Sequence, residues 1–239
     1  MKKYIILLLV VMGSSQLAHS QVLISLIFGD KLNTDAIEFG LDGGLNISRM
    51  NGFESATPVY DFNLGFYFDF RLKNQWYINT GVEVKSNVGL DKLTENDVAI
   101  LDPTFNYSDS GTFRQHLSYF EVQANIKYLF NNHFYYKAGT QFEFRGKSLL
   151  TFEGESNDKK VEVSTKNGTL FDRFQVSALA GIGYKLKQGE GMYIEVRYYY
   201  GLTNAFKGDD LRVHNNSIYF NVGIPVGKNK KPKETPCPD

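Results

Sequence analysis

Alternation of apolar and polar side chains with a period of two runs through most of the chain, and it constrains the fold more than any other feature. In residues 61–72, Phe62 and every second residue after it are apolar, whereas Asp61 and its counterparts form a largely polar face. Successive side chains of a β-strand point to opposite sides, so this period predicts strands that are apolar on one face. The pattern recurs in eight segments, namely 37–47, 61–72, 76–84, 117–130, 134–145, 173–186, 192–202 and 217–226.

The connections between these segments alternate in length. The short ones are 73–75, 131–133 and 187–191, and the long ones are 48–60, 86–116, 146–172 and 203–216. Short turns on one side and long loops on the other are typical of outer-membrane barrels, in which the turns face the periplasm. We therefore predict an all-β fold, an eight-stranded antiparallel transmembrane up-and-down β-barrel over residues 37–226.

The beginning of the chain has the pattern of a secretion signal. Two lysines precede an apolar run over residues 4–12, and Ala18 and Ser20 provide the small side chains that a signal peptidase requires. The apolar run is much shorter than the roughly 20 residues that a membrane-spanning helix needs. The sequence therefore predicts a cleaved signal peptide over residues 1–20.

Two further segments flank the predicted barrel, and an even number of strands places both on the side of the short turns. Residues 21–36 are expected to form a periplasmic N-terminal segment, and residues 227–239 a basic periplasmic tail. The lysines of the tail are Lys228, Lys230, Lys231 and Lys233. Such a tail could contact an envelope protein or a cell-wall polymer, or remain solvated.

The distribution of charge indicates which face meets lipid. Within the strands the apolar face carries no formal charge, and an unpaired charge facing lipid costs about 2–4 kcal/mol at the membrane midplane. The charged face also holds the glycines, such as Gly44 and Gly223, which suit the crowded interior of an eight-stranded barrel. We expect the apolar face to point outward; the alternative is a soluble barrel whose apolar face surrounds a ligand.

The interior of an eight-stranded barrel is just wide enough for side chains to fill it. We therefore expect the inward charges to form a network of ion pairs and hydrogen bonds rather than to line an open pore. The residues of this predicted lumen network are Glu38, Asp42, Asp69, Arg71, Glu83, Lys85, Glu121, Lys127, Lys137, Glu143, Arg145, Arg173, Lys185, Glu195 and Arg197.

Aromatic residues gather near the segment ends on the apolar face, as is typical of side chains at the membrane–water interface. The predicted interface aromatics are Trp76, Tyr128, Phe134, Tyr136, Tyr184 and Tyr200. Each of them also suits an ordinary strand, since aromatic residues are good strand formers.

Three stretches resemble a known family. Residues 117–128, LSYFEVQANIKY, resemble the Leu-x-Tyr-Leu-Glu-Ile-Pro-Leu-Leu-x-Lys-Tyr stretch of the Bacteroidetes-type outer-membrane β-barrel family, often called porin-like or PorT-like. Residues 39–48 and 218–226 are similar to its opening and closing strands, so the resemblance covers about 37–226. One departure is Gln123, where the family has proline. The resemblance implies an outer-membrane location and carries over no functional residue.

Few residues point to chemistry. The 26 basic and 26 acidic residues balance, so nothing suggests a nucleic-acid partner, and Cys237 is the only cysteine. We predict no catalytic residue, no metal site, no cofactor and no enzymatic activity. The one hint of a reaction is the pair His116 and Ser118, two apart on one strand face, which would suit a lipid-modifying barrel enzyme.

Two functions fit these patterns. The first is a structural or interaction scaffold that displays surface loops, and the alternative is a narrow porin-like channel for small solutes. Outer-membrane lipid, with lipopolysaccharide outside, is the expected surrounding partner. Acidic residues of the second long loop, such as Asp91, Glu95 and Asp97, could contact cations that bridge lipopolysaccharide, or simply be solvated.

Overall fold

The computed structural model describes residues 34, 36–103, 111–156, 159–186, 191–208 and 211–226. The predicted signal peptide, nearly all of segment 21–36 and the tail 227–239 lie outside these residues. No helix among the described residues is long and apolar enough to cross a bilayer.

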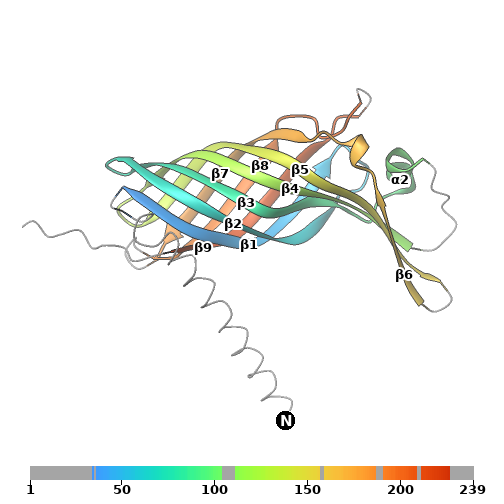
Figure 1. Ribbon diagram of the computed structural model, residues 1–239, viewed down its shortest axis with the longest axis horizontal. Coiled ribbons are helices and arrows are strands. Elements are labelled where there is room, and N and C mark those ends of the chain that lie inside the picture. The colour runs from blue at the N-terminus through green and yellow to red at the C-terminus, as the bar shows by residue number, and fades with distance from the viewer. Residues whose placement is uncertain are drawn as a thin grey trace, which may run out of the picture.

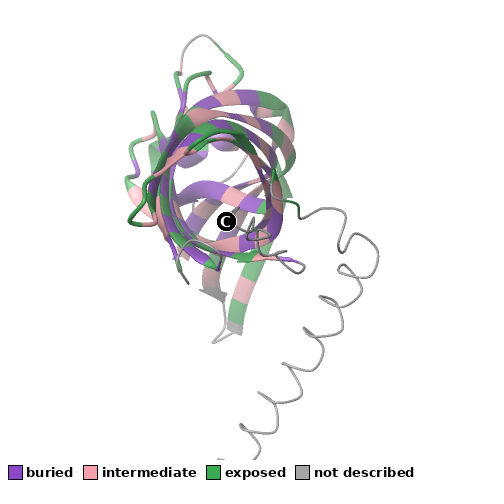
Figure 2. Ribbon diagram, turned by 90° about the vertical axis from the view of Figure 1, so that its left-hand side faces the viewer, coloured by how far each residue is buried: buried purple, intermediate pink, exposed green. Residues whose placement is uncertain are grey.

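Eight antiparallel strands close into a barrel (Figures 1 and 2). Each strand pairs with the next in the ring, and the last pairs with the first through partners such as Leu45 with Phe220. The ring consists of β1 (Ile37–Asn51), β2 (Thr57–Lys73), β3 (Trp76–Asp91), β4 (Gly111–Leu129), β5 (Phe134–Ser156), β7 (Phe174–Lys185), β8 (Tyr193–Gly201) and β9 (His214–Pro225). Each predicted segment corresponds to one strand, so the predicted eight-stranded fold is confirmed.

The strands extend farther than predicted at the end away from the short turns, called here the outer end. The expected loop 146–172 instead contains the end of β5, the strand β6 (Lys159–Lys166) and the short helix η1 (Gly168–Leu170). The expected loop 86–116 contains the rest of β3, the helix α2 (Glu95–Leu101) and the start of β4. Both loop predictions were therefore wrong over much of their length.

A shift in the inward–outward alternation within the strands explains why the two loop predictions were wrong. On β3 the register shifts between Glu83 and Ser86, so that Val84 and Lys85 are both exposed. An extra residue of this kind is a β-bulge, which reverses the inward and outward positions beyond it. After the bulge Val88 points inward and is fully buried, although the earlier alternation would have placed it outside.

The apolar face of the barrel points outward, as predicted. Phe62 and Ile182 on this face are 45% and 66% exposed, whereas Lys127 and Arg197 on the other face are 2% and 1% exposed. Figure 2 shows buried and exposed positions alternating along the strands around the ring. This arrangement contradicts the alternative of a barrel with an inward apolar face, because the outer surface would then be polar.

Glycines on the inner face make room for tyrosine rings. A Cβ atom added to Gly223 would overlap the ring of Tyr193 on the neighbouring strand. The same packing recurs for the pairs Gly40 with Tyr67 and Gly183 with Tyr135. These three tyrosines form one buried cluster, so the glycines fix where large aromatic rings can lie inside a narrow barrel.

We predict that Gly223→Ala destabilises the barrel by about 1–3 kcal/mol, because the added methyl group must displace the Tyr193 ring. Gly146→Ala is the matched control, since its added Cβ would meet only the carbonyl oxygen of Ser118, at 3.6 Å. Urea unfolding of the refolded proteins in detergent measures the stability of both variants. Equal midpoints for the two variants would contradict this account of the interior.

Candidate functional site

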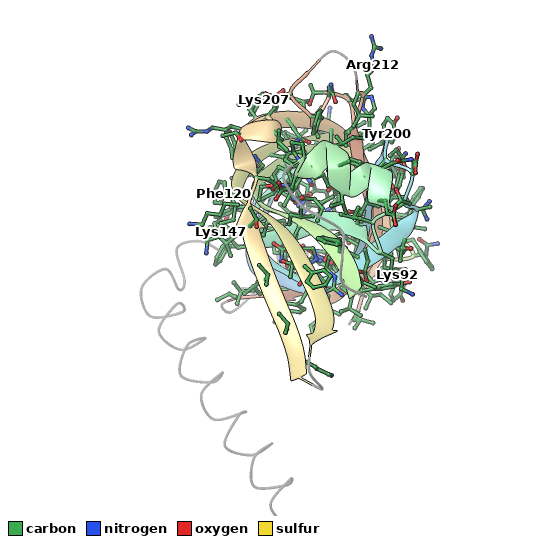
Figure 3. The ribbon with its side chains drawn as sticks, turned by 90° about the vertical axis from the view of Figure 1, so that its right-hand side faces the viewer. Lys92, Phe120, Lys147, Tyr200, Lys207 and Arg212 are labelled. Atoms are coloured by element: carbon green, nitrogen blue, oxygen red, sulfur yellow. The ribbon has the colours of Figure 1, made fainter. Side chains whose placement is uncertain are left out.

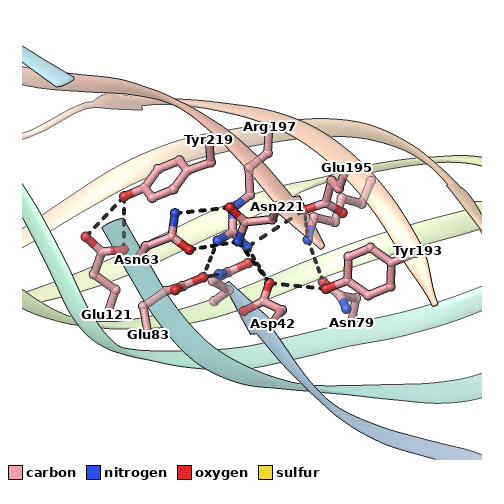
Figure 4. Close-up of polar contacts among 12 residues, drawn as sticks. Asp42, Asn63, Asn79, Glu83, Glu121, Tyr193, Glu195, Arg197, Tyr219 and Asn221 are labelled. Carbon is pink, nitrogen blue, oxygen red and sulfur yellow. Dashed lines mark hydrogen bonds and ion pairs between the residues drawn. The ribbon is translucent and has the colours of Figure 1, made fainter. Parts of the chain in front are cut away.

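Arg197 lies on β8 in the lumen, with 1% of its surface exposed. Its Nη1 atom is 3.4 Å from Oδ2 of Asp42 on β1, and its Nη2 atom contacts Oε1 of Glu83 on β3. Oε1 of Glu195 is 3.8 Å from Nη1, and the Tyr219 ring lies 4.7 Å from the guanidinium carbon. One side chain thus connects strands on several sides of the barrel (Figure 4).

Two lysines extend this network toward the short turns. Nζ of Lys137 is 2.9 Å from Oε1 of Glu195, and Nζ of Lys127 is 2.6 Å from Oδ2 of Asp69. Asn79 links the two pairs, because it donates to Asp69 over 2.7 Å and accepts from Lys137 over 3.3 Å. All five side chains are buried, so the two lysines and the two carboxylates balance one another's charges without water.

The tyrosine cluster supplies further donors to the carboxylates. Its hydroxyl groups donate from Tyr67 to Glu38 over 3.0 Å, from Tyr135 to Glu195 over 2.8 Å and from Tyr193 to Asp42 over 3.1 Å. Lys185 closes this end of the network with a 2.7 Å ion pair to Glu38. The lumen near the short turns is therefore filled by polar side chains that bond one another.

Glu121 and Glu143 have a different environment. They lie opposite each other on β4 and β5, and both are fully buried. Glu121 accepts from the hydroxyl group of Tyr219 over 3.3 Å, and Glu143 accepts from the hydroxyl group of Ser177. Within the described part of the chain, no ion pair to either carboxylate is present, so hydroxyl groups bond them instead of cations.

Four predicted bases lie outside the buried network, and the prediction was wrong for them. Arg71 is exposed beside the first short turn and donates to the carbonyl group of Asn74. Lys85 is exposed because of the β3 bulge, and Arg173 is exposed just before β7 begins. Arg145 is half-buried and donates to the backbone carbonyls of residues 168, 171 and 172, so it holds a loop in place.

The expectation of a polar lumen needs correcting at the outer end. There a cluster of buried apolar side chains fills the space between the strands and beneath α2. Its members are Met50, Val88, Leu90, Leu93, Val98, Leu101, Phe113, Leu117, Tyr119, Leu150, Phe152, Phe171, Leu179, Tyr199, Ala205, Val213 and Tyr219. We call these residues the outer plug. The sequence reasoning missed them because most follow a bulge or lie in an expected loop.

Asp97 attaches α2 to the β1–β2 loop. Its carboxylate accepts from the backbone N–H groups of Glu54, Ser55 and Thr94 over 2.8, 2.9 and 3.2 Å. The Thr94 hydroxyl group accepts from the Asp97 backbone in return, which completes a capping box. Asp97 is fully buried, so it is not available to bridge lipopolysaccharide through a cation, whereas Glu95 is exposed.

Arg114 links the strands next to α2. Its guanidinium group is 3.2 Å from Asp91 and 3.2 Å from Glu153. The hydrogen bond to Asp91 raises the pKa of Arg114 above its usual range. Asp91 is thereby paired within the protein rather than left free for external cations.

The predicted interface aromatics gather mostly at the short-turn end. Trp76 packs edge-on against Tyr128 at 4.8 Å, and Tyr136 stacks on Tyr128 at 5.7 Å. Phe134 meets Tyr184 at 4.9 Å in the same region. Tyr200 lies toward the outer end and stacks on His214 at 5.8 Å, as a separate contact.

Among the described residues we find neither a paired histidine and serine nor a cluster that could hold a metal ion. No hydrogen bond joins His116 and Ser118 there, and Nε2 of His116 is buried without a partner. The same residues contain no group of three or more histidine, cysteine, aspartate or glutamate side chains arranged to hold a metal ion.

Residues 21–207 match the family described as outer membrane protein beta-barrel domain. Among solved structures, the chain is similar to Ail of Yersinia pestis in complex with the heparin analogue sucrose octasulfate, with 13% identity, 80% of this chain and 99% of that chain covered and a TM-score of 0.42. It is also similar to Neisserial surface protein A, with 11% identity, coverage of 80% and 99% and a TM-score of 0.40. For OprG of Pseudomonas aeruginosa these values are 13%, 82% and 97%, and 0.36. No curated protein matches the chain.

We predict that Arg197→Gln destabilises the barrel by about 3–5 kcal/mol, because it leaves buried carboxylates without their cation. Arg173→Gln makes the same chemical change at an exposed position and should cost at most about 0.5 kcal/mol. The free energy of unfolding in urea, measured in detergent, compares the two. A similar cost for both would mean that water, rather than the carboxylates, solvates Arg197.

Proposed function

Because the chain belongs to the outer membrane protein beta-barrel domain family and is located in the outer membrane, we propose that it is a closed, non-enzymatic scaffold that presents a surface outside the cell. The outer end would then face the exterior and the short turns the periplasm, as in other barrels of this kind. The strand motifs of the sequence further favour the Bacteroidetes-type branch of such barrels.

The filling of the lumen carries this proposal. The polar network around Arg197 occupies the part of the barrel near the short turns, and the outer plug occupies the part beneath α2. Leu117 and Tyr199, both in the plug, are completely buried. A conducting pore would need a continuous wet path past both fillings. A solute would have to cross the apolar plug and also break the buried ion pairs, which favours a scaffold over a channel.

The surface offered for interaction is the projecting sheet at the outer end. It consists of the start of β4, the end of β5 and β6 (Figures 1 and 3). Among the described strands, β6 pairs only with β5, so its other edge has unpaired backbone groups. Val163 in the middle of β6 is 49% exposed. Such an edge can accept an extended segment of a partner protein. The basic tail, residues 227–239, remains a predicted contact for an envelope or cell-wall partner.

We predict that the refolded, unmodified chain produces no steady conductance steps in a planar lipid bilayer, because both parts of its lumen are filled. A general-diffusion porin inserted in the same bilayer provides the positive control. Insertion of the chain is verified separately by its resistance to extraction from proteoliposomes. Steady unitary steps from the inserted chain would overturn the proposal and favour the narrow channel.

A further inference from the structure

Two bulges lie on either side of β4 at the outer limit of the apolar outer surface. The β3 bulge exposes Val84 and Lys85. On β5 the register against β4 shifts between Arg145 and Ser148, which exposes Gly146 and Lys147. Bulges often redirect a side chain at the rim of a barrel. Here each of the two places a lysine on the outer surface.

Between the bulges lies an outward-facing groove of about 420 Å³. Its apolar part is formed by Val84, Phe120 and Phe144, which are 53%, 45% and 46% exposed. Lys85 and Lys147 line the same groove. Figure 3 shows Phe120 and Lys147 close together on one side of the outer end. The groove therefore combines an apolar surface with two cations where the apolar surface ends.

The two lysines are little neutralised by the protein. Nζ of Lys85 is 3.9 Å from Oδ1 of Asp61, and the side chain of Lys85 is 54% exposed. Asp61 already accepts from the backbone N–H of Phe62 over 2.7 Å and from Asn87 over 2.6 Å. Lys147 is exposed, and the described residues provide no carboxylate in ion-pair contact with it. The groove thus retains net positive charge, which suits an anionic ligand.

We propose that this groove binds a phosphoglycolipid of the outer leaflet, a lipid whose sugar headgroup carries a phosphate at each end. Its acyl chain packs on Val84, Phe120 and Phe144, and its phosphates bind Lys85 and Lys147. β4 separates the two lysine-bearing strands, so their backbones are about 10 Å apart. A headgroup with two separated phosphates matches that spacing better than a phospholipid with a single phosphate. A soluble anion would make no contact with the apolar part of the groove.

The test measures binding of diphosphorylated lipid A to the full chain in detergent micelles, by native mass spectrometry. The double variant Lys85→Gln/Lys147→Gln should bind about tenfold more weakly or worse, since each lysine donates a charge-assisted hydrogen bond to phosphate. The control Lys92→Gln/Lys207→Gln removes two other exposed lysines of the outer end (Figure 3) and should change binding less than about twofold. Enzymatically dephosphorylated lipid A should bind the unmodified chain about tenfold more weakly.

Three results would overturn the proposal. Unchanged binding by the groove variant would show that the two lysines do not contact the ligand. An equal loss in the control variant would indicate attraction by overall charge alone. Equally tight binding of phosphatidylglycerol would mean that any anionic lipid suffices. Retention of heat-modifiable migration in gels shows that each variant is folded, so a loss of binding cannot come from unfolding.

Discussion

The ion pairs of Arg197 are the interaction on which the interior of this barrel depends. A buried guanidinium group costs several kcal/mol unless carboxylates surround it, and here Asp42, Glu83 and Glu195 do so. Glu83 comes from β3, which lies across the lumen from β8, whereas Asp42 comes from β1, which only β9 separates from β8. The pair of Arg197 and Glu83 therefore forms only when the ring is closed. The ring of strands consequently closes in the same folding step in which the buried charge of Arg197 is neutralised.

The bulges divide the barrel into two regions with different fillings. On the short-turn side of the β3 bulge the inner face carries Glu83 and its charged neighbours. On the outer side of the bulge the inner face carries Val88 and Leu90. The same bulge sends Lys85 outward, which removes a cation from the lumen and places it on the outer surface. The extra residue in β3 thus turns Val88 and Leu90 into the outer plug, and together with the β5 bulge it supplies the two lysines of the proposed lipid groove.

The sequence predicted the features that regular strands produce and missed those that depend on contacts between distant segments. Alternation sufficed to place Asp42 and Arg197 inside, since both lie in uninterrupted stretches. It failed for Lys85, because a period of two cannot show where an extra residue is inserted. The helix α2 did have a local signal, the Thr94-x-x-Asp97 capping box before an apolar turn. The attachment of Asp97 to the β1–β2 loop had no local signal in the sequence, since its partners Glu54 and Ser55 lie more than 40 residues away.

The most direct test of the central claim is a double-mutant cycle on Arg197 and Glu83. Unfolding free energies in detergent are measured for Arg197→Gln, for Glu83→Gln and for the double variant. If the two groups neutralise each other in a dry interior, the double variant should be less destabilised than the sum of the single variants by more than about 1 kcal/mol. Costs that add to within about 0.5 kcal/mol would contradict the account and indicate a solvated lumen.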